Sequence, residues 1–233
     1  MRGRKVSSQR WLTRQLNDPF VAEAKARGFR SRAALKLEQI DDRYKLFAPG
    51  MSIVDLGCAP GGWLQVASIR TKLGSGPARL VGIDLMPTEG VVGAILFEGD
   101  IANPEMLEQV RSASGGTADG VLSDMAADTT GHRTTDHLRT TALLEVALDF
   151  SLDVLTPNGF FLAKCFRGGA ERSVLDVMRR NFKTVRHVKP AASRAESVES
   201  YVLATGFHGH GRADDVTVDT VAGRHDPSGR LID

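Results

Sequence analysis

The chain has 233 residues, 42% hydrophobic and 25% charged, which is typical of a globular protein with one sizeable domain. No apolar run approaches the roughly 20 residues of a membrane-spanning helix, and the basic N-terminus lacks the continuous apolar core of a secretory signal. We therefore expect a cytoplasmic protein without a membrane partner. Its two cysteines, Cys58 and Cys165, should be reduced and buried, and no Cys/His cluster has the spacing of metal ligands.

The N-terminal segment is strongly basic. The first 36 residues carry ten Lys or Arg and two acidic residues, a net charge of +8, which leaves −6 for the remainder of the chain. Residues 8–47 have a helical pattern, so we expect a basic helical arm over residues 1–47. Such an arm on a mildly acidic body favours a polyanionic partner, with nucleic acid as the first candidate, although a solvated basic helix face has the same composition.

From Met51 onward, short apolar runs alternate with segments of helical periodicity. Strands are expected at residues 52–56, 80–84, 94–98, 120–124, 159–164, 184–188 and 200–205. Helices are expected near 62–72, 103–112, 136–155 and 171–181. The sequence TPNGF, residues 156–160, predicts a turn that ends the third of these helices.

This alternation predicts an α/β domain over residues 48–207. Continuous apolar strands separated by helices are typical of a parallel sheet that is covered on both faces. The short gap between the last two strands predicts an antiparallel hairpin at the edge of the sheet. The tail over residues 208–233 is rich in Gly, Asp and Arg, and we expect it to be irregular.

The stretch IVDLGCAPGGW, residues 53–63, has the pattern of a strand, a glycine-rich turn and a helix start. Gly57, Gly61 and Gly62 fall where an open α/β sheet binds ligands, and the helix N-terminus favours an anionic group. Asp84 ends the next strand, where an acid accepts hydrogen bonds from ribose hydroxyls, and Asp100 follows the third strand within reach of an adenine amino group. An adenosine-bearing ligand is therefore predicted, with a purely structural turn as the alternative.

The same turn resembles a known cofactor motif. DLGCAPGGW is similar to the S-adenosylmethionine-binding motif of the FtsJ-like ribose 2′-O-methyltransferases. The resemblance continues, in family order, through GFRSRAALKLEQID before the turn and GIDLMP, FEGD, SDMA, GFFLAKCF and KPAASRAESVESYVLATG after it, and covers about residues 8–207. It is strongest to the branch that methylates a uridine ribose in the A loop of large-subunit ribosomal RNA.

The resemblance implies a Rossmann-like methyltransferase fold, with a seven-stranded, mostly parallel sheet that contains one antiparallel strand and has helices on both faces. It implies S-adenosylmethionine as cofactor, held by Gly57, Gly61, Gly62, Trp63, Asp84, Asp100 and Asp124. The family's catalytic set is matched by Lys36, Asp124, Lys164 and Glu199. One departure lies after Asp124, where the family usually has Pro-Asn and this chain has Ala127 and Asp128.

The chemistry explains these residue types. A ribose 2′-hydroxyl is a weak nucleophile and must lose its proton as it attacks the methyl group, so a neutral lysine suits the role of general base. Following the family, we assign that role to Lys164. We expect Lys36 to lower the pKa of Lys164 or to position the hydroxyl, and Asp124 and Glu199 to orient the lysines and bind the substrate. Ordinary ion pairs at strand ends are the alternative for any one of them.

The predicted substrate is ribosomal RNA in the large subunit, and we expect a monomer. Five basic residues of the arm are candidates to hold its phosphates: Arg10, Lys25, Arg27, Arg30 and Arg32. Transfer RNA is an alternative substrate for the same chemistry. A non-catalytic RNA-binding assembly factor and an NAD-dependent dehydrogenase are alternatives from other classes, and the G-x-A-x-G-G form of the turn disfavours the dehydrogenase.

Overall fold

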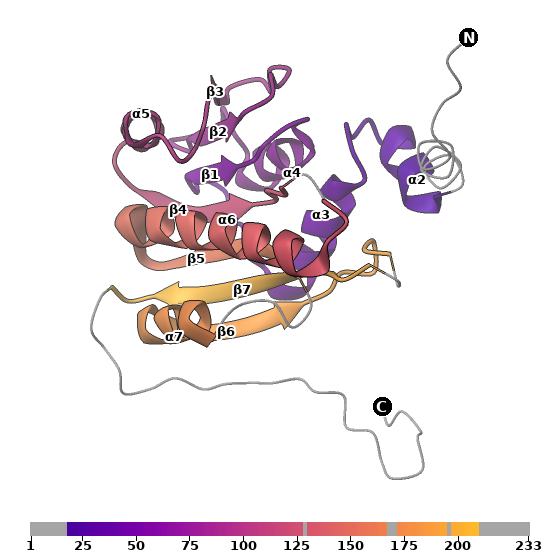
Figure 1. Cartoon of the computed structure of the whole chain (residues 1–233). Coiled ribbons are helices and arrows are strands. Elements are labelled where there is room, and N and C mark those ends of the chain that lie inside the picture. The colour runs from indigo at the N-terminus through magenta and orange to yellow at the C-terminus, as the bar shows by residue number, and fades with distance from the viewer. Residues whose placement is uncertain (1–17, 128–129, 167–171, 195–196, 210–233) are drawn as a thin grey trace.

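Seven strands form one sheet in the computed structural model, which describes residues 18–127, 130–166, 172–194 and 197–209 (Figure 1). The strands are β1 (Ile53–Leu56), β2 (Leu80–Asp84), β3 (Ile95–Glu98), β4 (Ala118–Ser123), β5 (Leu155–Phe166), β6 (Phe182–Val188) and β7 (Glu199–Phe207). Their order is β3-β2-β1-β4-β5-β7-β6. Strand β7 lies between β5 and β6 and runs in the direction opposite to the other six strands of the described sheet. The predicted mostly parallel sheet with one antiparallel strand is confirmed.

Helices cover both faces of this sheet (Figure 1). They are α2 (Pro19–Ala26), α3 (Ala33–Tyr44), α4 (Gly62–Thr71), α5 (Pro104–Ala113), α6 (Arg133–Val154) and α7 (Arg172–Asn181). Helices α5, α6 and α7 pack on one face, and α3 and α4 pack on the other. In the described part of the chain, no helix combines the length and apolar character needed to cross a membrane.

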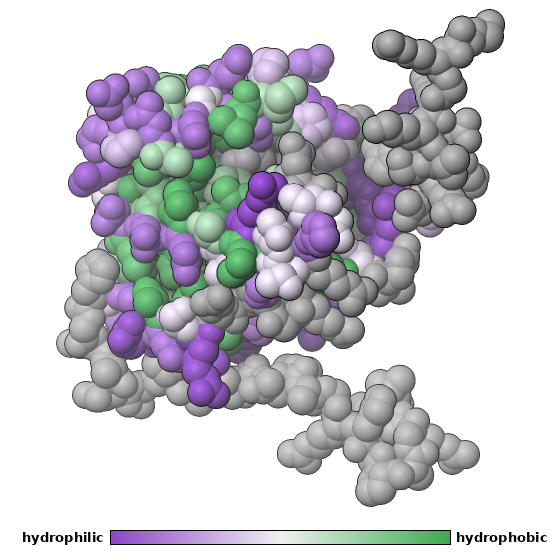
Figure 2. Space-filling model, in the orientation of Figure 1, coloured by the Kyte–Doolittle hydropathy of each residue, from purple (hydrophilic) through white to green (hydrophobic). Residues whose placement is uncertain are grey.

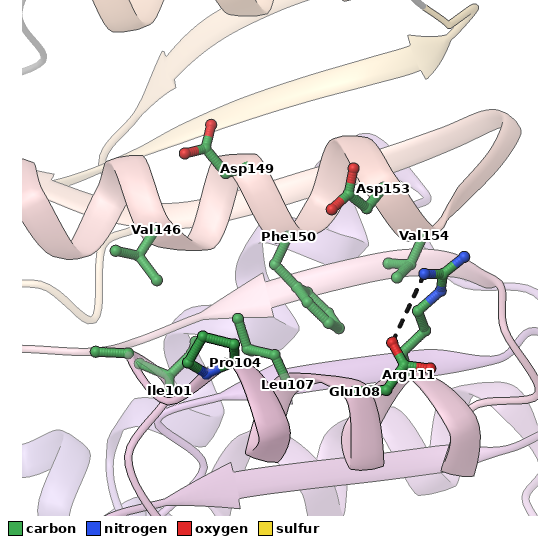
Figure 3. Close-up of a pocket in the computed structure, with 11 residues that line it drawn as sticks. Ile101, Pro104, Leu107, Glu108, Arg111, Val146, Asp149, Phe150, Asp153 and Val154 are labelled. Atoms are coloured by element: carbon green, nitrogen blue, oxygen red, sulfur yellow. Dashed lines mark ion pairs between the residues drawn. The ribbon is translucent and has the colours of Figure 1, made fainter.

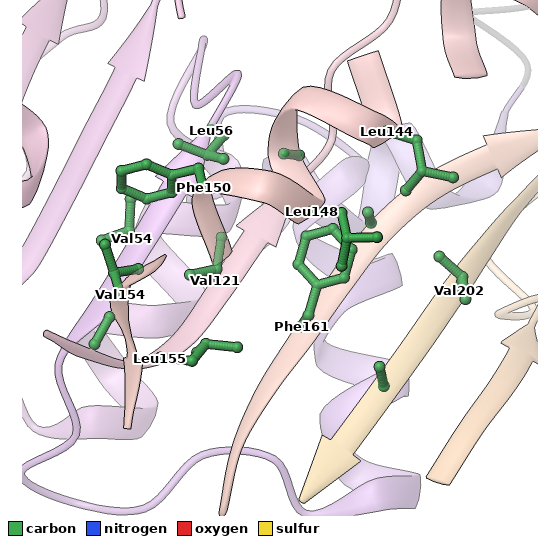
Figure 4. Packing of buried hydrophobic residues seen from close by; sticks show 14 of the residues in the cluster. Val54, Leu56, Val121, Leu144, Leu148, Phe150, Val154, Leu155, Phe161 and Val202 are labelled. Carbon is green, nitrogen blue, oxygen red and sulfur yellow. The ribbon is translucent and has the colours of Figure 1, made fainter. Parts of the chain in front are cut away.

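The two layers follow from alternation along the strands. In β5, Phe161 and Ala163 join the cluster beneath α6, whereas Phe160 and Leu162 join the cluster beneath α3 and α4. Because side chains alternate between faces, a strand buried on both sides reads as one apolar run. Figure 4 shows the first cluster, in which Leu144, Leu148 and Phe150 of α6 lie over Val121 of β4 and Phe161 of β5.

The boundary between α6 and β5 differs from the prediction. The turn sequence TPNGF lies within β5, which starts directly after α6 at Leu155. Asn158 adopts a positive φ of 65°, and the pairing with β4 shifts register between Ala118 and Gly120. The turn residues therefore produce an irregularity inside a strand and no separate loop.

The register of the central strands determines which residues meet at their carboxyl ends. Leu56 of β1 pairs with Ser123 of β4, and Ser123 pairs with Ala163 of β5. The glycine turn therefore begins beside Asp124, which directly follows Ser123, and Lys164 follows Ala163 at the same level. Lys164 in turn pairs with Tyr201 of β7. Residues far apart in sequence are thus brought to one edge of the sheet.

Candidate active site

Backbone hydrogen bonds hold the glycine turn against the end of β2. The amides of Gly57 and Cys58 donate to the carbonyl of Ile83, at 2.8 and 3.1 Å. The amide of Ala59 donates to Oδ2 of Asp84 at 2.8 Å, while Oδ1 of Asp84 accepts from the amide of Met86. Asp84 therefore orders both the glycine turn and the start of the loop after β2, and its half-exposed carboxylate retains lone pairs for a ligand.

Two glycines of the turn have conformations that other residues rarely adopt. Gly57 has φ +79°, and a Cβ there would lie 2.5 Å from the Met125 side chain. Gly61 has φ +105° and precedes α4 as its N-cap. The predicted glycine requirement is thus explained by backbone conformation and by close packing of protein groups around the turn.

Two lysine–carboxylate pairs stand beyond this turn. Nζ of Lys164 lies 3.0 Å from Oδ1 of Asp124 and donates to the Asp124 carbonyl at 2.8 Å. Lys36, on α3, forms a close ion pair with Glu199 at the start of β7. The exposed fractions of the two lysine side chains are only 10% and 9%, so both pairs are largely shielded from water. The structure brings all four predicted catalytic residues together.

Tyr201 joins the two pairs. Its hydroxyl lies 3.0 Å from Oδ1 of Asp124 and 3.3 Å from Oε1 of Glu199, and Nζ of Lys36 lies 5.9 Å from its ring centroid. The side chain is fully buried. The sequence analysis missed this residue, because a tyrosine in an apolar strand has the pattern of a core residue. The signal that was available is its position two residues after Glu199, on the same face of the strand.

The electrostatics of the cluster keep the Glu199 carboxylate charged and the Tyr201 phenol neutral. Although burial pushes the pKa of Glu199 upward, the charges of Lys36 and Lys164, with hydrogen bonds from Lys36 and Tyr201, hold that pKa below its ordinary value. Burial raises the pKa of Tyr201 well above its ordinary value, and the charges of Asp124 and Glu199 raise it further. Tyr201 therefore remains a hydrogen-bond donor between two anions.

A further carboxyl group lies beneath the site. Asp55 of β1 is fully buried, and neither of its oxygens has a hydrogen-bond partner among the described residues. Burial raises its pKa well above the ordinary value, and the negative charges of Asp124 and Asp84 add to this effect. An uncompensated buried acid at the strand ends suits a cationic ligand. S-adenosylmethionine carries an ammonium and a sulfonium group, so the acids present fit that cofactor.

The remaining predicted cofactor residues surround the same edge. Asp100 follows β3 with an exposed side chain whose Oδ1 accepts from the amide of Ala102, and the amide of the preceding Gly99 donates to the carbonyl of Asp84. Trp63 is buried, its indole donates to the carbonyl of Ala33 at 2.8 Å, and its ring lies 5.6 Å from that of Tyr201. Trp63 thus supports the site from below. Direct contacts of these residues with a cofactor stay predictions.

The predicted RNA-binding residues have different surroundings. Lys25 is exposed, and Arg27 forms an ion pair with Glu38 at 2.6 Å on the surface. Arg32 pairs closely with the buried Asp18 and donates to the carbonyl of Ala192. Arg30 donates hydrogen bonds to backbone carbonyls of the glycine turn and of the loop after β2. Arg10 lies outside the described residues. The RNA contacts of these five residues stay predictions.

A separate hollow lies between α5 and α6. It is a groove of about 410 Å³ with Leu107, Val146 and Phe150 among its apolar lining residues and with acidic residues at its rim (Figure 3). Figure 2 shows exposed hydrophobic residues over this face of the molecule. The groove contains neither the glycine turn nor any of the four predicted catalytic residues, so it is distinct from the site at the strand ends.

Comparison with known proteins agrees with this geometry. A model of the family described as FtsJ-like methyltransferase matches residues 29–207. The chain belongs to this family. The matched range contains the glycine turn and all four residues of the two ion pairs, and it begins just before Arg30. The sheet of this FtsJ-like methyltransferase, with β7 between β5 and β6, is a Rossmann-like α/β fold.

Several relatives are similar over most of their length. The chain is 54% identical to "Ribosomal RNA large subunit methyltransferase E" of Maricaulis maris over 89% of this chain and 73% of that protein. It is 54% identical to the protein of the same name from Granulibacter bethesdensis, over 91% and 90% of the two chains. A solved structure from Plasmodium falciparum, described as a ribosomal RNA methyltransferase, superposes with a TM-score of 0.69 at 26% identity, covering 78% of this chain and all of that one.

Proposed function

We propose that this FtsJ-like methyltransferase transfers a methyl group from S-adenosylmethionine to a ribose 2′-hydroxyl of large-subunit ribosomal RNA, with the A-loop uridine as the expected acceptor. The cluster at the ends of β4, β5 and β7 carries this proposal, because two lysines and two carboxylates joined by Tyr201 suit deprotonation and orientation of a hydroxyl. The names of the similar bacterial proteins support ribosomal RNA as the substrate. We expect the reaction to take place in the cytoplasm.

The cofactor site in this proposal is formed by the glycine turn and the neighbouring acids. Asp84 accepts hydrogen bonds from the ribose hydroxyls, and Asp100 accepts one from the adenine amino group. Asp55 and Asp124 balance the positive charges of the cofactor. Gly57 and Gly61 give the turn the positive φ angles that fix the course of its backbone beside the proposed site. When bound, S-adenosylmethionine supplies an electrophilic methyl group on a positively charged sulfur.

The protein's own groups then handle the substrate proton. Lys164 acts as base only in its neutral form, so its ion-paired ammonium group first releases a proton to solvent and then accepts the proton that the 2′-hydroxyl loses as its oxygen attacks the methyl carbon. Methyl transfer would form the bond between that oxygen and the methyl carbon, and the electron pair of the broken carbon–sulfur bond would stay with the departing neutral thioether. Asp124 holds Lys164 in place, and the Lys36–Glu199 pair positions the ribose.

The experiment offers labelled S-adenosylmethionine with three acceptors: large ribosomal subunits that lack the modification, naked ribosomal RNA, and transfer RNA. The expected product is a single 2′-O-methyl uridine in the A loop. Lys164→Ala should abolish the transfer while cofactor binding is retained. Lys183→Ala, at an exposed position of β6, is the matched control and should retain activity.

Other outcomes would change the proposal in defined ways. Label on transfer RNA would preserve the chemistry and refute the ribosomal substrate. Turnover by Lys164→Ala would remove that residue from the role of base. Cofactor and RNA binding without any transfer would favour an assembly factor over an enzyme.

A further inference from the structure

The connection between α2 and α3 lies directly on the cofactor turn. The amide of Arg30 donates to Oε1 of Gln65 in α4 at 2.9 Å, and Nε2 of Gln65 donates back to the carbonyl of Gly28 at 3.0 Å. The Trp63 indole fixes the start of α3 through Ala33. Three contacts therefore hold residues 28–33 against the first turns of α4.

The guanidinium of Arg30 reaches two different backbone segments. Nη1 donates to the carbonyl of Pro60 at 3.2 Å and to that of Glu89 at 2.6 Å, while Nη2 donates to the carbonyl of Gly90 at 2.8 Å. Pro60 belongs to the glycine turn, and the other two residues belong to the loop after β2. A planar guanidinium presents several donors in a fixed geometry and can bridge acceptors that a lysine cannot reach together.

The glycine pair of the turn accommodates this connection. A Cβ at Gly61 would overlap Nη1 of Arg30, and a Cβ at Gly62 would lie 2.5 Å from Oγ of Ser31. Consecutive residues of the connection therefore pack onto consecutive glycines of the turn. The glycine pair is explained by contact with protein, and Arg30 occupies the space that a side chain at Gly61 would fill.

The bridged loop forms one side of the proposed cofactor site. It follows Asp84, the last residue of β2, and begins with Leu85 and Met86, whose exposed fractions of 67% and 64% are high for large apolar side chains. An apolar surface beside a ribose-binding acid suits the ring of a bound adenosine. The position of this surface relative to the glycine turn depends on the Arg30 bridge, because Arg30 binds both segments.

We propose that Arg30 is a positioning residue for the S-adenosylmethionine site and does not serve mainly to bind RNA phosphates. The proposal rests on the proposed cofactor. Both hydrogens of Nη1 and one of Nη2 are directed at carbonyl oxygens, so the group is engaged within the protein. The same connection leads into α3 and Lys36, so Arg30 also fixes the catalytic lysine relative to the cofactor turn.

The test compares Arg30→Ala and Arg30→Lys with the control Arg43→Ala. Arg43 is an exposed residue of α3, and its replacement removes the same charge as Arg30→Ala. Calorimetry measures the dissociation constant for S-adenosylmethionine without RNA. We expect Arg30→Ala to bind about ten-fold more weakly, as the loss of hydrogen bonds worth about 1.4 kcal/mol implies. Arg30→Lys should lie between Arg30→Ala and the wild type, and Arg43→Ala should match the wild type.

Two further measurements separate this role from RNA binding and from misfolding. RNA affinity at several salt concentrations should show an unchanged slope in Arg30→Ala, because no phosphate contact is lost. Hydrogen exchange should be faster at residues 85–92 in Arg30→Ala and unchanged in Arg43→Ala. Unchanged cofactor affinity and exchange, with a smaller salt slope, would overturn the proposal and assign Arg30 to RNA.

Failure of the proposed function has a different signature. Wild-type protein that binds no S-adenosylmethionine would contradict the cofactor assignment itself. Exchange at residues 85–92 would still decide whether Arg30 holds the loop against the turn, since that readout requires no ligand. The more conservative Arg30→Lys keeps the test decisive if Arg30→Ala does not fold.

Discussion

Replacing Tyr201 with phenylalanine removes one buried hydroxyl and leaves the ring in place. The hydroxyl is the link between the Lys164–Asp124 pair and the Lys36–Glu199 pair, at 3.0 Å from Asp124 and 3.3 Å from Glu199. Without it, the two carboxylates face each other with no neutral donor between them. The variant should therefore be less stable and less active, although it should keep its cofactor affinity.

The size of the effect follows from the contacts. A hydrogen bond to a charged group stabilises a folded protein by about 1.5–3 kcal/mol. Tyr201 shares one proton between two acceptors, and each acceptor keeps a lysine partner, so we expect a loss of about 2 kcal/mol. For a domain of this size that corresponds to a fall in Tm of about 4–8 °C. The rate of transfer should fall about ten-fold, because Asp124 no longer holds Lys164 as firmly.

The loss should depend on pH in a defined direction. The pKa of Glu199 is lowered in the folded protein, so its stabilising interactions are present above the unfolded value of about 4.3 and disappear as the pH falls through the folded value. The stability difference between wild type and Tyr201→Phe should therefore be largest near neutral pH and shrink in acid.

The assay combines thermal unfolding between pH 3 and 8 with single-turnover transfer. Tyr44→Phe is a matched control, since the same hydroxyl is removed from a half-buried tyrosine for which the described residues show no hydrogen bond to the hydroxyl. Equal Tm and equal rates for Tyr201→Phe and wild type would refute the bridging role. A rate loss that came only with weaker cofactor binding would place Tyr201 in a different role.

Two further predictions concern the cofactor side of the site, and a third concerns the two buried cysteines. Asp84→Asn should weaken cofactor binding about ten- to hundred-fold, because Asp84 accepts a hydrogen bond from the Ala59 amide and is expected to accept others from the ribose. An unchanged dissociation constant would show that Asp84 is not part of the cofactor site. A cation lowers the raised pKa of Asp55, so cofactor binding should release a proton, and the affinity should increase with pH until the pH exceeds the pKa of Asp55 in the free protein. This dependence should flatten in Asp55→Asn, and calorimetry in two buffers measures the proton release. Burial raises the pKa of Cys58 and of Cys165 to about 12, so both thiols should react with alkylating reagents only after unfolding, and rapid labelling of native protein would contradict their burial.

The central sheet was predictable because its strands are buried on both faces. The segment predicted at 80–84 has the observed bounds, and the predicted hairpin of the last two strands is confirmed. Helix α6 starts three residues before its predicted start, at Arg133. The prediction of a turn at TPNGF between the helix and the strand was wrong. Asn158 does adopt a positive φ, but it does so within β5, where the pairing with β4 shifts register. Local residue preference indicates a bend and does not indicate whether pairing continues through it.

The site was predictable only in part, for a similar physical reason. The motifs around Lys36, Asp124, Lys164 and Glu199 predict residues that meet at one edge of the sheet. The partners of Arg30 lie 30 to 60 residues away, and a basic residue in a basic segment gives no sign of a backbone acceptor. Such long-range contacts depend on how α3 packs against α4.

The contacts of Arg30 and Lys36 explain how the basic N-terminal segment contributes to a site at the carboxyl ends of the strands. Arg30 binds the glycine turn, and six residues later Lys36 pairs with Glu199 of β7. Seven consecutive residues therefore contact both the proposed cofactor region and the catalytic cluster. Because α3 is buried against α4 between these two contacts, a shift of the segment at one end would be transmitted to the other. Under the proposed function, an RNA that displaced this segment would move Lys36 relative to the glycine turn, so we expect substrate binding and the position of Lys36 to be coupled through α3.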